Sequence, residues 1–353
     1  MRLGDLTGDR DNNFQLIRFL AASAVIFFHC YALTDHWTDE PLWRIAPELN
    51  LSVLGVGAFF VVSGFLVTRS WLERGRLVPF VAARLLRIYP ALIGATLLTI
   101  VLAAWSSTVP WRAFLADART HDYAWRTVLA WDFVTGLPGA FATNPYRDAV
   151  NGSLWTLPIE LRLYIGVGLA GVAGLLGRRY LWAGVTLALV ALVAAKPEWL
   201  PVVPGDKATR SLALLFGLGS VAYAFRAAIP VTLAGLAGAV ALVAVNPWGV
   251  GRGVVFPVLL AYIVLVVAYH PRLRWRAFNR LGDYSYGLYV FSFPIQQILI
   301  AKCGPPMASS PVALLAAAFP LTLVLAAVSW HAVEQPALRL KSRFDRPGAS
   351  AKA

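Results

Sequence analysis

The chain is built from one long apolar segment after another, with short polar breaks between them. A helix of about 20 apolar residues is what crosses the roughly 30 Å hydrocarbon core of a bilayer. The composition agrees, because 58% of the residues are hydrophobic and 14% are charged, against about 45–50% and 25% in soluble domains. The sequence therefore predicts an all-α, polytopic integral membrane protein with about ten transmembrane helices. We expect the spans at about 14–34, 51–70, 86–106, 156–176, 180–196, 209–226, 229–246, 253–269, 281–302 and 311–333.

The distribution of the basic residues indicates how these spans are oriented. With the N-terminus in the cytoplasm, most of the 31 Lys and Arg residues fall on the inner side, as the positive-inside rule requires. The C-terminus then also lies in the cytoplasm, and the long break at about 107–155, rich in Trp, Asp, Gly and Pro, becomes an extracytoplasmic loop. No repeat at a fixed period divides the chain. We therefore expect a single membrane domain over residues 1–345 and a short cytoplasmic tail at 346–353.

The net charge of +13 does not indicate a nucleic-acid-binding protein. The basic residues stand in short clusters between apolar runs, and not on one face interleaved with aromatic residues. The two cysteines, Cys30 and Cys303, form no CxxC pair, so neither a metal site nor a disulfide framework is expected. The first apolar run carries Arg18 and His29, and we expect it to be a retained helix and not a cleaved signal peptide.

Ionisable side chains inside the spans are few, and each is a candidate for function because its burial in a membrane is costly. Arg18 and His29 lie about three turns apart on the first helix. Glu160 lies near the outer end of the fourth span, at a depth close to that of His29, and Tyr164 follows it on the same helix face. His29 and Glu160 thus have the makings of a general base and its partner. The alternative is that they never meet and that His29 is a core histidine bonded to a backbone carbonyl.

Several stretches of the chain carry a resemblance to a known family. They are FQLIRFLAASAVIFFHCYAL from Phe14, FFVVSGFLVTRSW from Phe59, FVAARLLRIYPAL from Phe80, GSLWTLPIELRLY from Gly152, LGDYSYGLYVFSFPIQQ from Leu281 and HAVEQPALRL from His331. In this order they resemble the membrane acyltransferase family often called acyltransferase family 3, whose members O-acetylate lipopolysaccharide, exopolysaccharides, Nod-type oligosaccharides and macrolide sugars. Two positions differ: Ser292 stands where many members have a histidine, and Gln335 stands where a basic residue is common.

The resemblance implies an O-acyltransferase that uses acyl-CoA as co-substrate, with no tightly bound cofactor and no metal. Acetyl is the family's commonest acyl group. The acceptor would be a hydroxyl of a cell-envelope polysaccharide, its lipid-linked precursor or another glycosylated molecule. The expected location is the bacterial cytoplasmic (inner) membrane, with the bilayer, the acyl-CoA and the saccharide as partners. His29 matches the histidine held to be essential in the family, and Glu160 falls on a characteristic position; direct transfer and an acylated His29 both remain open.

The resemblance also implies where the donor binds. Arg84 and Arg87 match the family's RxxR element, lie one turn apart near the inner surface and can offer guanidinium forks to phosphate. Arg18 is a third candidate, and Tyr89 follows the same element. The alternative for Arg84 and Arg87 is that they only anchor a helix at the inner surface. The thioester would reach from these residues toward His29.

Other side chains are candidates for acceptor binding or transition-state support, namely Trp155, Tyr164, Ser63 and Tyr289. Ser63, like Gly55 and Gly57, is of a type that more often packs helices together in membranes. Trp and Tyr residues of the 107–155 loop are candidates for stacking on sugar rings.

A rival interpretation is transport, with the chain as a carrier of acyl or glycosyl compounds that uses His29 and Glu160 as a proton relay. Transporters commonly contain internal repeats with Gly or Pro interruptions at matching places in two halves. The sequence shows neither feature, so the enzyme is the preferred interpretation.

Overall fold

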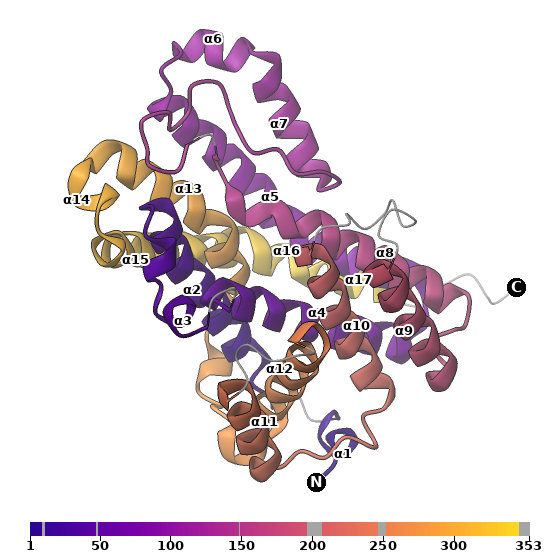
Figure 1. Cartoon of the computed structure of the whole chain (residues 1–353). Coiled ribbons are helices and arrows are strands. Elements are labelled where there is room, and N and C mark those ends of the chain that lie inside the picture. Colours follow the sequence, from indigo (N-terminus) through magenta and orange to yellow (C-terminus); the bar gives the residue numbers. More distant parts are fainter. Residues whose placement is uncertain (9–10, 47–48, 148, 196–206, 246–251, 346–353) are drawn as a thin grey trace, which may run out of the picture.

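The protein is described by a computed structural model for residues 1–8, 11–46, 49–147, 149–195, 207–245 and 252–345. Within these ranges the regular structure is helical, and β-pairing is confined to one isolated bridge between Arg2 and Pro230. Figure 1 shows the helices gathered into one bundle. The predicted all-α class is therefore confirmed.

A helix occupies each of the predicted ranges. The long helices are α2 (Phe14–Leu33), α4 (Leu51–Arg74), α5 (Leu77–Ser106), α8 (Leu157–Val172), α9 (Arg179–Ala195), α10 (Lys207–Ala224), α11 (Leu233–Val245), α12 (Arg252–Tyr269), α13 (Ser285–Cys303) and α15 (Pro311–Ser329). Among the described residues, four helices are long and apolar enough to cross a membrane: Phe14–Leu33, Leu51–Arg74, Leu77–Ser106 and Pro311–Phe344. Shorter apolar helices cover Ala208–Ala224, Leu233–Val245 and Val255–Tyr269. These lengths and compositions are those of a membrane protein.

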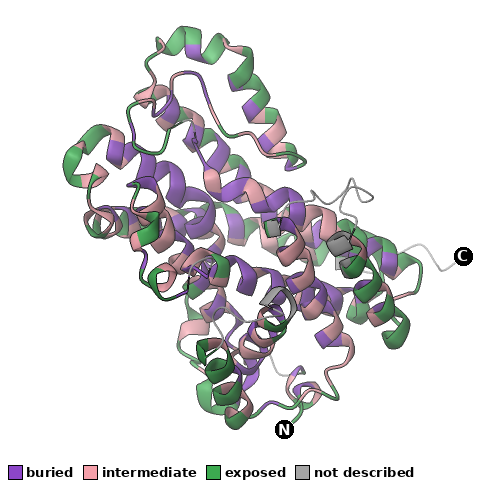
Figure 2. Ribbon diagram, viewed as in Figure 1, coloured by how far each residue is buried: buried purple, intermediate pink, exposed green. Residues whose placement is uncertain are grey.

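The shorter helices lie between the long ones and at the two ends of the bundle. They are α1 (Leu3–Leu6), α3 (Pro41–Ile45), α6 (Trp111–Ala116), α7 (Ala118–Leu129), α14 (Pro305–Ala308), α16 (Gln335–Arg339) and α17 (Lys341–Asp345), together with the 3-10 helices η1 (Trp37–Asp39), η2 (Gly152–Thr156), η4 (Pro271–Leu273) and η5 (Phe278–Arg280). The polar break at 107–155 thus contains α6 and α7, which project from one end of the bundle in Figure 1. Figure 2 shows that these two helices are largely exposed, whereas the buried residues gather in the long helices.

Helix α4 makes the closest helix contacts in the bundle. A Cβ at Gly55 would lie 2.5 Å from the backbone oxygen of Ala21 on α2, so α2 and α4 approach to backbone contact there. On α4 and α10, Gly64 and Gly219 each face a backbone carbonyl of the other helix at similar closeness. Small residues allow such approaches between membrane helices. These glycines place α4 in the middle of the structure.

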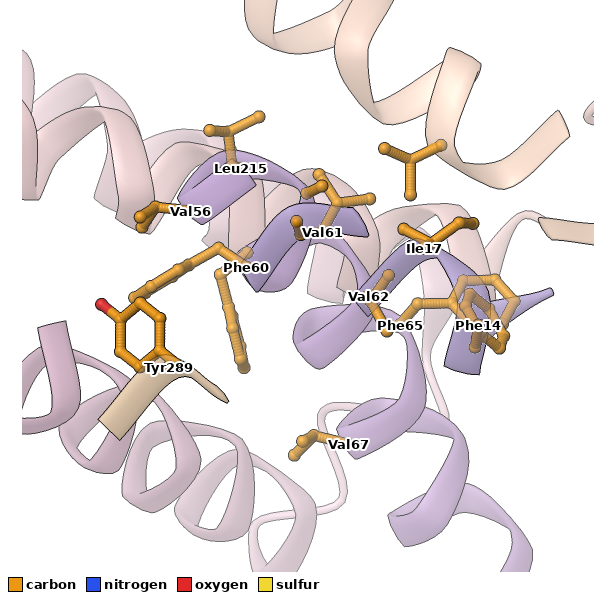
Figure 3. Packing of buried hydrophobic residues seen from close by; sticks show 14 of the residues in the cluster. Phe14, Ile17, Val56, Phe60, Val61, Val62, Phe65, Val67, Leu215 and Tyr289 are labelled. Atoms are coloured by element: carbon orange, nitrogen blue, oxygen red, sulfur yellow. The ribbon is translucent and has the colours of Figure 1, made fainter. Parts of the chain in front are cut away.

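Aromatic side chains fill the interior where α2, α4 and α12 meet. The ring of Phe14 lies 5.8 Å from that of Phe65 and 5.2 Å from that of Tyr269, the latter edge to face. Figure 3 shows Phe14 next to Phe65, with Tyr289 at the far end of the same cluster. Offset and edge-to-face pairs of this kind stabilise a core beyond the area that they bury.

A proline inside α13 frees a carbonyl group that binds the segment before α8. Pro294 has no N–H, so the carbonyl of Val290 loses the partner that a regular helix would supply. The side-chain amide of Asn151 donates to this carbonyl at 2.9 Å. The segment before α8 is therefore held against the middle of α13.

Helix α15 ends in a turn of π-helix, Trp330–Glu334, before α16 begins. Short π segments inside α-helices redirect side chains and are frequent at functional sites. Here the turn presents Glu334, which is buried, to the interior of the bundle.

Candidate functional site

A cavity of about 360 Å³ lies between α4, α5, α8 and α13. Along α4 its lining runs from Val56 to Arg74, which corresponds to about 27 Å of helix axis. Arg69, Arg74 and other charged side chains line one end, whereas Phe59 and Tyr289 line the other. The cavity is thus long, charged at one end and apolar at the other.

Three polar side chains meet in the wall of this cavity. The hydroxyl of Ser63 donates to Glu160 Oε1 at 2.7 Å, and the hydroxyl of Tyr164 donates to the same oxygen. The hydroxyls of Ser63 and Tyr164 are themselves 2.7 Å apart. Glu160 and Tyr164 come together because residues four apart share a face of α8, and Ser63 reaches them from α4. The carboxylate therefore holds two hydroxyl groups in place.

Arg84 lies next to this group, on α5. Its guanidinium is 4.7 Å from the centre of the Phe80 ring and 5.9 Å from that of Tyr164, and it donates to the Ser70 hydroxyl at 3.3 Å. Among the described residues no carboxylate lies within ion-pair distance of it. A guanidinium that rests on aromatic rings in a cavity wall is well placed to bind an anionic ligand.

Arg18 and Arg87 line the same cavity but have acidic partners. Asp283 Oδ2 lies 2.7 Å from Arg18 Nη2 and 2.8 Å from Arg87 Nη2. Arg87 Nη1 lies 3.6 Å from Glu334 Oε2, and the other oxygen of that carboxylate accepts from Ser329 at 2.9 Å. This ion network, Arg18–Asp283–Arg87–Glu334, ties α2, α5, the loop before α13 and the π-helical turn together.

Asp283 and Glu334, the two acids of the ion network, lie in stretches that resemble the family, but neither was predicted from the sequence as a site residue. A signal was available, because two arginines expected at the membrane's inner boundary need negative partners, and Asp283 and Glu334 flank the last two spans. Neither local periodicity nor motif spacing shows that they face Arg18 and Arg87.

His29 stands outside the cavity. Its ring lies 5.1 Å from that of Phe293, edge to face, and its Nδ1 atom is buried with no hydrogen-bond partner among the described residues. Neither a hydrogen bond nor an ion pair joins it to Glu160, although both residues are among those described. Tyr289, one turn before Phe293 on α13, lines the cavity. The structure therefore does not bring the expected pair together: His29 packs against Phe293, whereas Glu160 lines the cavity with Tyr289.

The remaining predicted residues divide between the cavity and the protein around it. Tyr289 lines the cavity with its hydroxyl 2.7 Å from that of Thr156, and its ring is 5.6 Å from that of Phe59. Tyr89 does not line it; its hydroxyl donates to the Leu129 carbonyl at 3.4 Å. Trp155 packs against the hydrophobic core, also away from the cavity lining.

Within the described ranges, no cluster of three or more His, Cys, Asp and Glu side chains has the arrangement of a metal site. Cys30 and Cys303 are both free thiols.

Comparison with known proteins assigns the chain to a family. The family model described as an acyltransferase domain matches residues 11–331. The chain belongs to acyltransferase family 3. This acyltransferase is 29% identical over 335 residues to a protein of Shigella phage Sf6 named O-acetyl transferase, with 92% of this chain and 96% of the relative covered. It is 28% identical over 372 residues to nodulation protein 10 of Rhizobium leguminosarum bv. viciae, with 94% of each covered. No solved structure matches the acyltransferase significantly.

The ion network yields a prediction about stability. Asp283→Asn leaves two neighbouring guanidiniums without their shared counter-charge, and we expect it to lower the free energy of unfolding by about 3 kcal/mol, near the lower end of values for broken buried pairs. The matched control is Asp39→Asn, whose ion pair with Arg44 is exposed on both sides and should contribute less than about 1 kcal/mol. Thermal unfolding of both variants in the same detergent measures the difference. Equal unfolding temperatures for Asp283→Asn and the control would contradict a stabilising ion network.

Proposed function

We propose that this membrane acyltransferase transfers an acyl group, with acetyl as first choice, from cytoplasmic acyl-CoA to a hydroxyl of a saccharide in the cell envelope. The observation that carries the proposal is the cavity. It has a basic end and an apolar end, and the Glu160 side chain lines it between them. An acyl-CoA has the matching polarity, since its phosphates are anionic and its acyl end is apolar. The name of the Shigella phage Sf6 relative, O-acetyl transferase, supports acetyl as the acyl group and an oxygen atom as its acceptor.

The proposed topology places ten helices across the bacterial inner membrane with both termini in the cytoplasm. The positive-inside rule supports this orientation. Helix α4 then runs inward, so that Arg69 and Arg74 lie at its cytoplasmic end and the basic end of the cavity faces the compartment that contains acyl-CoA. In the same orientation α6 and α7 lie on the extracytoplasmic side of that membrane.

The donor phosphates are assigned to Arg84 and the basic mouth of the cavity. Arg84 faces the cavity without a carboxylate partner in the described structure, whereas Asp283 already compensates Arg18 and Arg87. The two arginines of the RxxR element therefore have different tasks: Arg84 binds the donor and Arg87 holds the cavity wall. From Arg84 the pantetheine arm would run along α4 toward Phe59 and Tyr289, which places the thioester beside or beyond Glu160.

The reaction needs a base for the acceptor hydroxyl. His29 accepts the hydroxyl proton, the hydroxyl oxygen forms a bond to the thioester carbonyl carbon, and the carbon–sulfur bond then breaks. The proton passes to the CoA thiolate, so that an ester and free CoA result. Glu160 keeps the Ser63 and Tyr164 hydroxyls oriented beside the donor. Since His29 packs on Phe293 and does not line the cavity, the cycle includes a change in the rotamers of Tyr289 and Phe293.

The first test is on Arg84. Arg84→Ala removes a charged hydrogen-bond donor to the phosphates, a contact worth about 1.5–3 kcal/mol, so the Kd for acetyl-CoA should rise at least about tenfold. The matched control is Arg44→Ala, which alters an exposed arginine outside the cavity. Calorimetric titration in nanodiscs measures both. Unchanged acetyl-CoA binding by Arg84→Ala would remove the donor site from this cavity.

The second test is on His29. His29→Ala should lower acetyl transfer or acetyl-CoA hydrolysis by about 10²–10⁴-fold, because general base catalysis typically contributes that much. Donor binding should stay within about twofold of the wild type, since His29 does not line the cavity. Product formation from radiolabelled acetyl-CoA reports the first quantity and calorimetry the second. If the wild-type protein neither binds nor converts any short acyl-CoA, the enzyme proposal fails and transport becomes the hypothesis to test.

A further inference from the structure

A stripe of polar residues follows one face of α13. Ser285, Tyr289, Ser292 and Gln296 are spaced i, i+4, i+7 and i+11, so they share one side of the helix. Ser285 and Tyr289 line the donor cavity, and Ser292 and Gln296 do not. The stripe therefore continues past the apolar end of the cavity, and Ser292 and Gln296 lie beyond the Tyr289 ring.

These two residues carry polar atoms that no group in the described part of the chain satisfies. Ser292 and Gln296 are both 0% exposed, and neither Ser292 Oγ nor Gln296 Oε1 has a hydrogen-bond partner among the described residues. A serine inside a helix usually bonds to a carbonyl of the preceding turn, as Thr96 and Thr322 do here. An unsatisfied buried polar atom destabilises the folded state because it has lost its hydrogen bonds to water. Two such atoms one turn apart on one helix face indicate a place for a ligand's polar group.

The stripe lies beside His29. The amide nitrogen of Gln296 donates to the Ile26 carbonyl at 2.9 Å and to Cys30 Sγ at 3.0 Å, which fixes its side chain against α2. His29 precedes Cys30 and rests on Phe293 of α13, and its Nδ1 atom is a third buried atom for which the described ranges supply no hydrogen-bond partner. Helices α2 and α13 thus bring an imidazole, a hydroxyl and an amide oxygen into one region of their interface.

We propose that Ser292, Gln296 and His29 form the acceptor side of the catalytic site and bind a hydroxyl group of the saccharide. A sugar hydroxyl has one proton and two lone pairs, so it can accept from Ser292 Oγ and pass its proton to the imidazole, while a neighbouring hydroxyl of the same sugar donates to Gln296 Oε1. The inference rests on the proposed function, because it names the acceptor half of the same reaction. It also explains why His29 is absent from the donor cavity: the base belongs to the other substrate.

Tyr289 separates the two halves of the site. Its hydroxyl is bonded to Thr156 and its ring packs on Phe59, on the donor side, while Ser292 and Gln296 follow it on the acceptor side. In this arrangement the donor thioester and the acceptor hydroxyl meet only when the Tyr289 ring moves. Such a partition limits the access of water to the thioester before an acceptor has bound.

The test is Ser292→Ala, because a hydroxyl that is merely buried and a hydroxyl that binds the acceptor predict different transfer rates for this variant. If the hydroxyl is merely buried, its removal is neutral or slightly stabilising and leaves kcat/KM for the saccharide unchanged. If it binds the acceptor, kcat/KM for the saccharide should fall at least about tenfold while the Kd for acetyl-CoA and the unfolding temperature stay at or above wild-type values. The acceptor used is the best substrate of the wild type in a panel of methyl glycosides and chito-oligosaccharides.

Two variants serve as references. Ser23→Ala removes a hydroxyl from α2 that is bonded to the Phe19 carbonyl and should leave transfer unchanged. Ser292→Cys keeps the volume and a weak donor, so its transfer rate should lie between those of the wild type and Ser292→Ala. Wild-type transfer rates in Ser292→Ala would overturn the acceptor assignment.

Failure of the acceptor site and failure of the proposed function give different results. A wild type that does not bind acetyl-CoA contradicts the proposed function itself. A wild type that binds and hydrolyses acetyl-CoA, yet acylates no saccharide of the panel, leaves the donor cavity standing and overturns the saccharide site.

Discussion

The ion network of Arg18, Asp283, Arg87 and Glu334 is the interaction on which the site depends. Guanidinium groups inside a membrane bundle are costly unless they are paired. One carboxylate, Asp283, contacts both arginines at 2.7 and 2.8 Å, and Glu334 adds a second partner to Arg87. These contacts join four separate parts of the chain around the cavity. They also leave Arg84, one turn away, as the arginine that faces a ligand.

The close packing of α4 gives the cavity its other boundary. Glycines on α4 and α10 bring the two helices to backbone contact, and Gly55 does the same toward α2. With these faces closed, Ser63 points from a neighbouring face of α4 toward Glu160 and Tyr164 of α8. A rigid α4 therefore supports one wall of the donor site, and α13 supplies the surface shared by the two proposed half-sites.

Much of the fold could be predicted from the sequence, because helix formation in a membrane depends on local apolar length. Helices occupy all of the predicted ranges, and the turn spacing of Glu160 and Tyr164 correctly placed both on one face of α8. The contacts between helices could not be predicted in the same way. They depend on the rotation and depth of each helix, which no single segment encodes. Thus similar depth suggested that His29 meets Glu160, whereas His29 packs against Phe293 and Glu160 lines the cavity with Tyr289.

The different partners of Arg84 and Arg87, the two arginines of the RxxR element, could not be predicted for the same reason. Spacing showed that Arg84 and Arg87 are one turn apart, and it suggested a matched pair on the phosphates. A turn of helix is enough to direct Arg87 to Asp283 and Arg84 to the rings of Phe80 and Tyr164. Only the arrangement of α13 and the π-helical turn reveals the difference.

The most direct test of the account is a structure of the protein in nanodiscs with acetyl-CoA, determined by electron cryomicroscopy. If the proposed donor site is correct, density for acetyl-CoA lies along α4. Its phosphates lie at Arg84 and the basic end of the cavity, and its thioester lies beside or beyond Glu160, short of the Tyr289 ring. Acetyl-CoA bound elsewhere, with the space between α4, α5, α8 and α13 closed, would contradict it.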